Sequence, residues 1–317
     1  AVTLGGTVFE IDYAGGTGND VVLKVAGVVE TSVTIAGPAL VITDANAGDT
    51  ADNLKLTISA TGYTLTDTTA MNAITVDIEG AVRNSAYEVF VPFTSLTGIT
   101  EIDIDTLDGV DVVTIDFAGL NGASLQQKIV FAGGAGNGDT LAFENGAFTR
   151  VVHRMFDGSS GTIDLDNDVN TDIEVEYSGL EPVLFNSGTA TDFVFTLPAG
   201  ADNAQLSESG GFLTLASTDA TPTFESTTFA APSGSITING QAGDVLTVST
   251  ALDLSTADAD GTGLILNVET INLDGGAIDT GTSAQTYNGA VTLGADTTVD
   301  GGNISFRGTV DGNAAGT

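Results

Sequence analysis

One short stretch of the sequence has residue types and a spacing suited to calcium. The segment GGTGNDVVL, Gly15 to Leu23, matches the nonapeptide pattern G-G-x-G-x-D-x-U-x of calcium-binding β-rolls, with Asp20 at the carboxylate position and Asn19 beside it. A β-roll needs consecutive nonapeptides, and the next nine residues, KVAGVVETS, do not repeat the pattern. GGAGNGDTL, residues 133–141, is a near copy with one residue inserted before Asp139. Each segment therefore predicts either a bound calcium ion or a sharp structural turn.

A third acidic segment, DLDND, begins like the calcium loop of an EF-hand. That loop requires Gly at its sixth position and Glu at its twelfth, where this sequence has Val169 and Val175. The EF-hand interpretation therefore fails. Two interpretations stay open, a solvated turn or strand edge and a looser calcium site built from Asp164, Asp166 and Asp168.

The composition excludes several classes of function. The 317 residues include 42 Asp plus Glu against 7 Lys plus Arg, a net charge of -35 that repels nucleic acid and anionic lipid. No apolar run reaches the length of about 20 residues that a membrane span needs. The absence of Cys and the single His make a zinc site improbable. That His153 stands between Arg150 and Arg154, which indicates a role in local charge balance.

The apolar residues alternate with a period of two, which predicts many short strands joined by tight turns. Several of these strands follow an Asp that is itself preceded by Gly or Asn. In most copies the second and fourth residues after the Asp are apolar and are expected to face a common interior: Leu54 and Leu56, Val113 and Ile115, Leu141 and Phe143, Leu246 and Val248. The copy at Asp20 is weaker, because Lys24 takes the fourth place.

Longer segments of the chain also resemble each other, which predicts a repeat organisation. AGDTADNLKLTISATGYTLT in the first half is similar to PAGADNAQLSESGGFLTLAS in the second. We therefore expect residues 26–285 to form the main body with two diverged sub-repeats, about 40–150 and 190–285. Residues 1–25 are interpreted as the end of a preceding repeat unit, and residues 286–317 as strands leading into the next one.

The predicted fold class is all-β, in the form of a β-solenoid, or parallel β-helix, of short strands. A strand-turn module that cannot bury its own apolar face has to stack on its neighbours, which favours a solenoid. The alternative is a series of tandem β-sandwich domains, which also consist of short strands and turns. That alternative predicts linkers about every 100 residues and none is seen, so the solenoid is favoured.

Several segments resemble giant, repeat-rich bacterial surface or secreted proteins with filamentous-haemagglutinin-like or autotransporter-associated strand repeats. The segments are GTVFEIDYAGGTGNDVVL, ADNAQLSESGGFLTLAST, PSGSITINGQAGDVLTV and QTYNGAVTLGADTTV, with YSGLEPV and ISFRGTVDG. The resemblance implies an extracellular parallel β-helix that serves as an adhesin, stalk or fibre at the bacterial cell surface. It carries over no catalytic residues.

We therefore expect a structural, non-enzymatic segment that associates with itself or continues end to end in a longer chain. The alternatives are a β-helix that binds or cleaves carbohydrate, with a polysaccharide or cell-surface ligand, and a calcium-dependent RTX-like module of a secreted protein. Alternating acids such as Asp103 with Asp105 could serve carbohydrate cleavage. In so acidic a chain such pairs also arise from composition alone. Calcium is the only cofactor that the residues suggest.

Overall fold

The computed structural model describes residues 2–15, 20–46, 51–69, 72–120, 125, 127–136, 138–166, 173–255, 261–294 and 296–312. The chain is all-β, and its described part contains one short 3-10 turn, η1 (Phe93–Ser95), besides the strands. No helix within these ranges is long and apolar enough to span a membrane. The contacts divide the chain into two compact units, which are described separately: Ala1–Glu144 with Ser178–Leu180, and Asn145–Tyr177 with Glu181–Thr317.

The first unit contains the strands β1 to β13, all of them short except β2 and β3. In chain order they are β1 (Val2–Leu4), β2 (Thr7–Gly15), β3 (Asp20–Ala36), β4 (Ala39–Asp44), β5 (Asn53–Ser59), β6 (Gly62–Asp67), β7 (Asn72–Val76), β8 (Val82–Arg83), β9 (Glu88–Pro92), β10 (Glu101–Asp105), β11 (Val112–Gly119), β12 (Lys128–Ala132) and β13 (Thr140–Glu144).

Two parallel stacks form the centre of this unit. β10 pairs in parallel with β4 and β12, and β11 pairs in parallel with β5 and β13. Antiparallel strands extend both stacks, as β1-β2-β3-β4 on one side and β5-β6-β9-β8 on the other. The register aligns buried side chains of successive strands in rows: Leu40, Ile102 and Ile129; Ile42, Ile104 and Phe131; Leu54, Val113 and Leu141; Leu56, Ile115 and Phe143.

The second unit contains the strands β14 to β32, most of them three to seven residues long. They are β14 (Gly146–Asp157), β15 (Ser160–Asp166), β16 (Ile173–Ser178), β17 (Val183–Phe185), β18 (Gly188–Thr196), β19 (Asn203–Ser209), β20 (Phe212–Ser217), β21 (Thr227–Ala230), β22 (Ser235–Asn239), β23 (Val245–Val248), β24 (Leu252–Asp253), β25 (Gly263–Asn267), β26 (Thr270–Leu273), β27 (Ala277–Asp279), β28 (Ala284–Tyr287), β29 (Ala290–Leu293), β30 (Thr298–Asp300), β31 (Asn303–Phe306) and β32 (Val310–Gly312).

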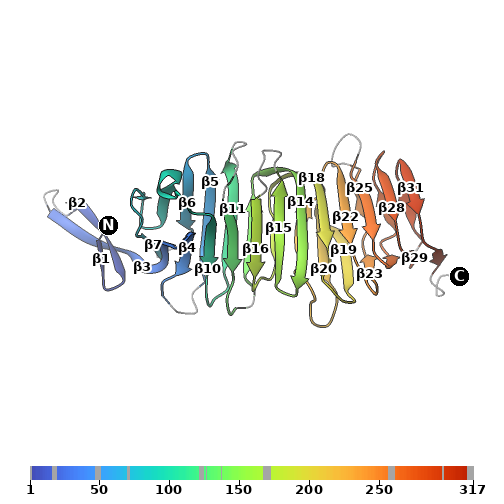
Figure 1. The fold of residues 1–317 in the computed structure, drawn as a ribbon, viewed down its shortest axis with the longest axis horizontal. Helices are drawn as coiled ribbons and strands as arrows, with labels where there is room; N and C mark the ends of the chain where they lie inside the picture. Colours follow the sequence, from blue (N-terminus) through green and yellow to red (C-terminus); the bar gives the residue numbers. More distant parts are fainter. Residues whose placement is uncertain are drawn as a thin grey trace. The chain divides into compact units, whose positions relative to one another are not determined.

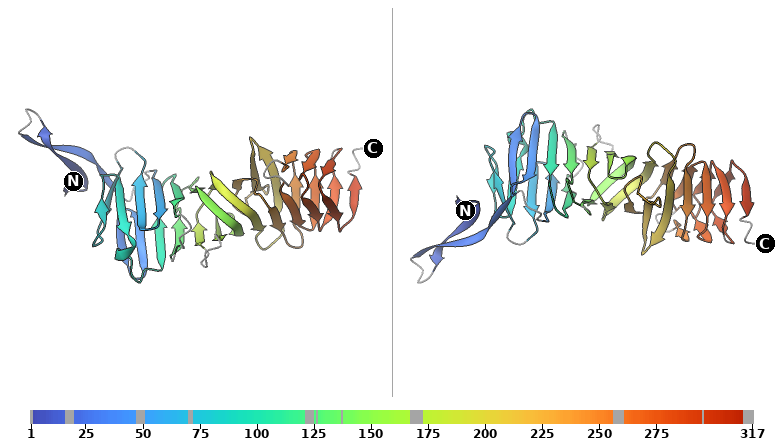
Figure 2. Two further views of the ribbon diagram at one scale, coloured as in Figure 1. Left: turned by 90° about the horizontal axis from the view of Figure 1, so that it is seen from above. Right: turned by 90° about the horizontal axis from the view of Figure 1, so that it is seen from below.

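Three parallel stacks form most of this second unit. One runs β14-β18-β22-β25-β28-β31, the second β19-β23-β26-β29-β32, and the third β24-β27-β30. In Figure 1 the strands β18, β22, β25, β28 and β31 of the first stack follow one another along the unit, and Figure 2 shows the successive layers from above and below. Antiparallel strands interrupt the pattern at β14-β15-β16 and at β19-β20-β21.

The core of the second unit consists of rows of side chains that project inward from aligned positions. Along one row, the register places Phe193 of β18, Ile236 of β22 and Leu264 of β25 at successive levels. These side chains are at most 4% exposed. The next inward row contains aromatic side chains, Phe195 and Tyr287 among them, and both are fully buried. The alternation along each strand thus creates the core, because every second side chain is removed from water.

Replacing a side chain of an inward row should destabilise the second unit much more than replacing its outward neighbour. Leu264 is fully buried, whereas the adjacent Ile265 is half-buried on the opposite face of β25. We expect Leu264→Ala to lower the free energy of unfolding by about 2–5 kcal/mol, because it leaves a cavity. Ile265→Ala should cost about 1 kcal/mol or less. Urea denaturation followed by circular dichroism measures both, and equal losses would contradict this assignment of the interior.

Candidate functional site

A row of buried aspartates links the parallel strands of the first unit. Asp52, Asp111 and Asp139 directly precede β5, β11 and β13, and each is at most 1% exposed. The backbone N–H of Asp52 donates a hydrogen bond to Oδ1 of Asp111, and the N–H of Asp111 donates one to Oδ1 of Asp139, both at 2.8 Å. We call this row the aspartate ladder. Two of its carboxyl groups thus accept the amide of the aspartate on the neighbouring strand.

The second unit contains an equivalent pair. The N–H of Asp202 donates a hydrogen bond of 2.9 Å to Oδ1 of Asp244, and both residues are buried. Close packing against these aspartates requires glycine at two nearby positions. A Cβ atom on Gly240 would lie 2.6 Å from Oδ2 of Asp244, and one on Gly133 would lie 2.8 Å from the Cβ of Asp139. A larger residue at either glycine would therefore displace the carboxyl group from its position.

Four acidic side chains gather beside the end of the aspartate ladder. We call this group, Glu30, Asp44, Asp52 and Asp67, the acid cluster; each member is at most 7% exposed. No described group donates a hydrogen bond to either carboxyl oxygen of Asp52 or to Oδ2 of Asp44. Burying several ionised carboxyl groups next to each other is unfavourable, so this arrangement favours the binding of a proton.

The electrostatics of the acid cluster favour protonation. Burial raises the pKa of Asp52 from 3.8 to about 8, and the nearby carboxyl groups of Asp67 and Asp44 contribute to this rise. Burial also raises the pKa of Asp67, to about 6. At neutral pH the Asp52 side chain is therefore mostly protonated, and its O–H supplies a donor to a group otherwise rich in acceptors.

The residues predicted to hold calcium are not brought together by the described part of the chain. Asp139 belongs to the aspartate ladder, with its Oδ1 accepting a backbone N–H. Asp164 and Asp166 lie on one face of β15, and the Asp164 carboxylate pairs with the guanidinium of Arg154. Asn19, Asp168 and the side chain of Asp20 lie outside the described residues.

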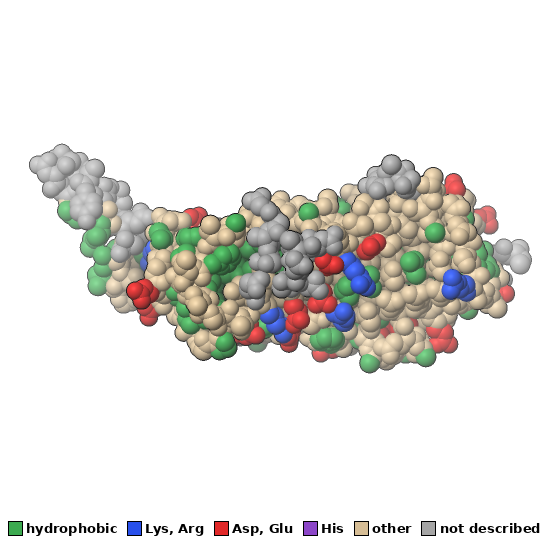
Figure 3. Space-filling view, turned by 45° about the horizontal axis from the view of Figure 1, so that its top comes forward, with side chains coloured by type: hydrophobic (Ala, Val, Ile, Leu, Met, Phe, Trp, Pro, Cys, Tyr) green, Lys and Arg blue, Asp and Glu red, His purple; other side chains and the backbone are tan. Residues whose placement is uncertain are grey.

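Within the described ranges, no three His, Cys, Asp or Glu residues are grouped so that they could hold a metal ion. Calcium binding therefore stays a prediction. On the face of the surface shown in Figure 3, acidic side chains occur in small groups, some of them next to Lys or Arg. In the first unit Lys55 contacts Asp116 and Glu144, each at 2.8 Å. These two carboxylates therefore have a basic partner.

His153 lies at an inward position of β14, fully buried. Its Nε2 is 2.6 Å from the Tyr177 hydroxyl, and its Nδ1 is 3.1 Å from Oγ1 of Thr227. Burial lowers the pKa of His153 to about 3, so the ring is neutral at neutral pH. The expectation that this residue contributes to local charge balance is therefore wrong. A neutral imidazole has one donor and one acceptor, and the two hydroxyl groups engage both nitrogens.

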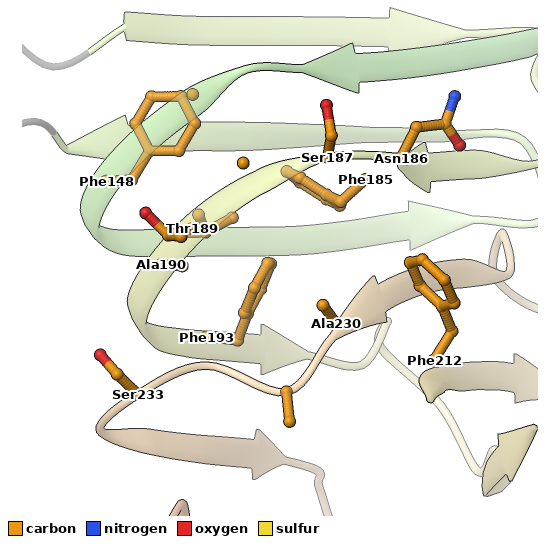
Figure 4. Close-up of a pocket in the computed structure, with 14 residues that line it drawn as sticks. Phe148, Phe185, Asn186, Ser187, Thr189, Ala190, Phe193, Phe212, Ala230 and Ser233 are labelled. Atoms are coloured by element: carbon orange, nitrogen blue, oxygen red, sulfur yellow. The ribbon is translucent and has the colours of Figure 1, made fainter. Parts of the chain in front are cut away.

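A cavity of about 430 Å³ opens in the second unit (Figure 4). We call it the aromatic pocket. Uncharged hydroxyl and amide side chains lie among its lining residues, and no acidic or basic side chain does. The lining comes from β14, β17, β18, β20 and β21 and the segments next to them: Gly146, Phe148, Val151, Phe185, Asn186, Ser187, Gly188, Thr189, Ala190, Phe193, Phe212, Ala230, Ala231 and Ser233.

The shape of the aromatic pocket depends on packed rings and on glycine. The ring of Phe193 lies 5.1 Å from Phe185 at an interplanar angle of 83°, and 4.7 Å from Phe229. The ring of Phe193 is therefore fixed by packing against two other rings. At Gly146 a Cβ atom would lie 2.1 Å from the ring of Phe148, so only glycine lets this ring lie across the strand.

No protein family model, curated protein or solved structure matches this chain. The functional argument therefore rests on the geometry of the two units. Three features bear on it: the aspartate ladder, the acid cluster and the aromatic pocket. The first two involve side chains that are removed from water, and the third is open to it.

Removing an acceptor of the aspartate ladder should destabilise the first unit. Asp111→Ala leaves the buried N–H of Asp52 without its partner, and we expect a loss of about 1–3 kcal/mol in the free energy of unfolding. Asp111→Asn keeps an oxygen at that place and should cost clearly less. Urea denaturation of both variants followed by circular dichroism provides the comparison. Wild-type stability for Asp111→Ala would show that the hydrogen bond does not matter.

The acid cluster predicts stability that declines as the pH rises. Because the pKa of Asp52 is about 8 in the folded chain against 3.8 ordinarily, its stabilising protonation is complete below pH 4 and is lost toward pH 8. One pKa unit corresponds to about 1.4 kcal/mol, so the change should be readily measurable. Asp52→Asn cannot ionise and should unfold at a higher temperature than the wild type at pH 8.5, but not at pH 4.

Thermal melts between pH 4 and 8.5, with a chelator present to remove divalent cations, measure this difference. Asp77→Asn changes an exposed aspartate of the same unit and is the matched control. Its melting temperature should follow the wild-type curve at every pH. A wild type and an Asp52→Asn variant with parallel curves would refute the assignment of a buried proton to Asp52.

Proposed function

We propose that the chain is a structural, non-enzymatic segment of a large extracellular bacterial surface protein, such as an adhesin, stalk or fibre. In this proposal the stacked strands are successive coils of a β-solenoid. The observation that carries the proposal is the parallel, in-register stacking of short strands, joined by buried aspartates at equivalent places. Repetition of one small unit in this way builds an extended scaffold from modest sequence information.

The pairing supports a solenoid over tandem sandwiches. Sandwich domains of the immunoglobulin type consist of antiparallel sheets, whereas β22, β25, β28 and β31 pair in parallel throughout. Parallel neighbours require a crossover between them. Here the strands of the second and third stacks occupy the crossovers, as β23 and β24 do between β22 and β25. Each turn of the chain thus adds one strand to each stack, which is the arrangement expected of a solenoid.

Self-association or continuation of the stack is part of the proposal. The side chains of Ile304 and Phe306 on β31 and of Val310 on β32 are 36–46% exposed. In the register Phe306 follows Tyr287 and Val310 follows Val291, whereas Ile304 follows the polar Gln285. A further layer of strands on this face would bury them and would pair the backbone edge. We therefore place end-to-end contact with another unit, or with a second copy, at β31 and β32.

The surface location can be tested on bacteria that produce the protein. We expect an antibody against residues 1–317 to label intact cells in immunogold electron microscopy, on filaments or on a layer outside the envelope. Cells from which the gene is deleted provide the control. Label restricted to the cytoplasm, or labelled material that consists of separate globular particles, would contradict the proposal. The acidic surface is compatible with this exterior, because a net charge far from zero favours solubility.

A further inference from the structure

The aromatic pocket is unusual in this chain because it lacks charge. Acidic residues outnumber basic ones by 42 to 7, and yet no side chain of either kind lines the pocket. A ligand that carries a charge would find no partner there, and an anion would in addition be repelled by the net charge of -35. The lining therefore selects an uncharged occupant.

The walls of the pocket favour rings over flexible polar ligands. Phe148 and Phe212 contribute rings to the wall, and Phe193 and Phe185 meet nearly at a right angle within it (Figure 4). Phe212 is 39% exposed, an unusual state for a ring of that size in a well-packed strand. A bound ring would remove this surface from water and could stack on it or meet it edge-on.

The size and stiffness of the pocket fit one small molecule. The volume of about 430 Å³ falls within the range of roughly 300–1,000 Å³ that is usual for ligand sites. Phe193 is fixed by its contacts with Phe185, Phe195 and Phe229, so the pocket does not need to form upon binding. Asn186, Ser187, Thr189 and Ser233 add polar groups at the margin that could orient a ligand.

We propose that the aromatic pocket is a binding site for an uncharged, largely apolar small molecule that contains a flat ring. This site goes beyond the structural role and does not depend on it. An oligosaccharide would leave many of its hydroxyl groups without partners against four phenylalanine rings, and sugars are therefore not the preferred ligand. The chemistry of the lining thus separates this site from a carbohydrate site.

Binding can be tested on the whole chain with N-phenyl-1-naphthylamine, an uncharged aromatic probe whose fluorescence rises in apolar surroundings. We expect saturable binding of one equivalent, displaced by indole and not by maltoheptaose. Ala230 is exposed and its side chain borders the pocket, so Ala230→Leu fills the space without disturbing the core. This variant should weaken binding by about tenfold or more. Phe212→Ala should also weaken it, because it removes one wall.

Ala290→Leu is the matched control, since it makes the same change at an exposed strand position of the second unit outside the pocket. Its affinity should equal that of the wild type, and all variants should melt like the wild type. The absence of saturable binding to the wild type would overturn the proposal. So would equal affinity of Ala230→Leu and wild type, or displacement of the probe by the oligosaccharide.

Discussion

When parallel strands stack in register, the turn before each strand recurs at every level of the stack. The buried backbone N–H at that turn therefore needs an acceptor at every level. In the first unit Asp111 and Asp139 supply this acceptor, for the N–H of Asp52 and of Asp111 in turn, and in the second unit Asp244 supplies it for the N–H of Asp202. A buried N–H without an acceptor costs about 1–3 kcal/mol, and the cost would recur at each level. This demand explains why acidic residues occupy places that are closed to water, where carboxyl groups are otherwise rare.

The same demand accounts for the acid cluster. On one side of β5 lies β11, whose preceding aspartate accepts the N–H of Asp52. On its other side lies β6, which is antiparallel and therefore presents a different backbone pattern. No described N–H reaches the carboxyl group of Asp52 from that direction. The ladder thus ends in a buried carboxyl group with other acids around it. A proton bound to this carboxyl group supplies the hydrogen-bond donor that the strand pairing does not provide.

Much of the fold follows from the sequence, because the two-residue alternation identifies the side chains that are buried. The apolar residues expected inside after Asp52, Asp111, Asp139 and Asp244 are all buried in aligned rows. The antiparallel interruptions at β14-β15-β16 and β19-β20-β21 are not evident in the same way, because alternation is identical in parallel and antiparallel strands. Domain limits at residues 25 and 285 stay predictions.

The functional side chains were harder to predict, because the Gly-Asp pattern suggests calcium when each copy is considered alone. The two aspartates joined by each of these hydrogen bonds lie at least 28 residues apart in the chain. The alternation of inward and outward positions along a strand could nevertheless have identified some of these side chains. Asp44 lies two residues after Ile42 and four after Leu40, on the same buried face of the strand, and His153 lies two residues after the buried Val151. A polar residue in phase with an inward row has to be buried, so it needs a partner or a proton.

The aromatic pocket lies where the regular stacking of the second unit is interrupted. Aligned rows fill the interior when each level repeats the one before it, as they do from β22 to β28. In the second sheet β20 and β21 are antiparallel insertions next to β19, and the lining of the pocket comes from these two strands together with β14, β17 and β18. Aromatic rings occupy much of the space there, because they are the largest apolar side chains available. The interruption of the repetition therefore coincides with a concave site that has uncharged walls.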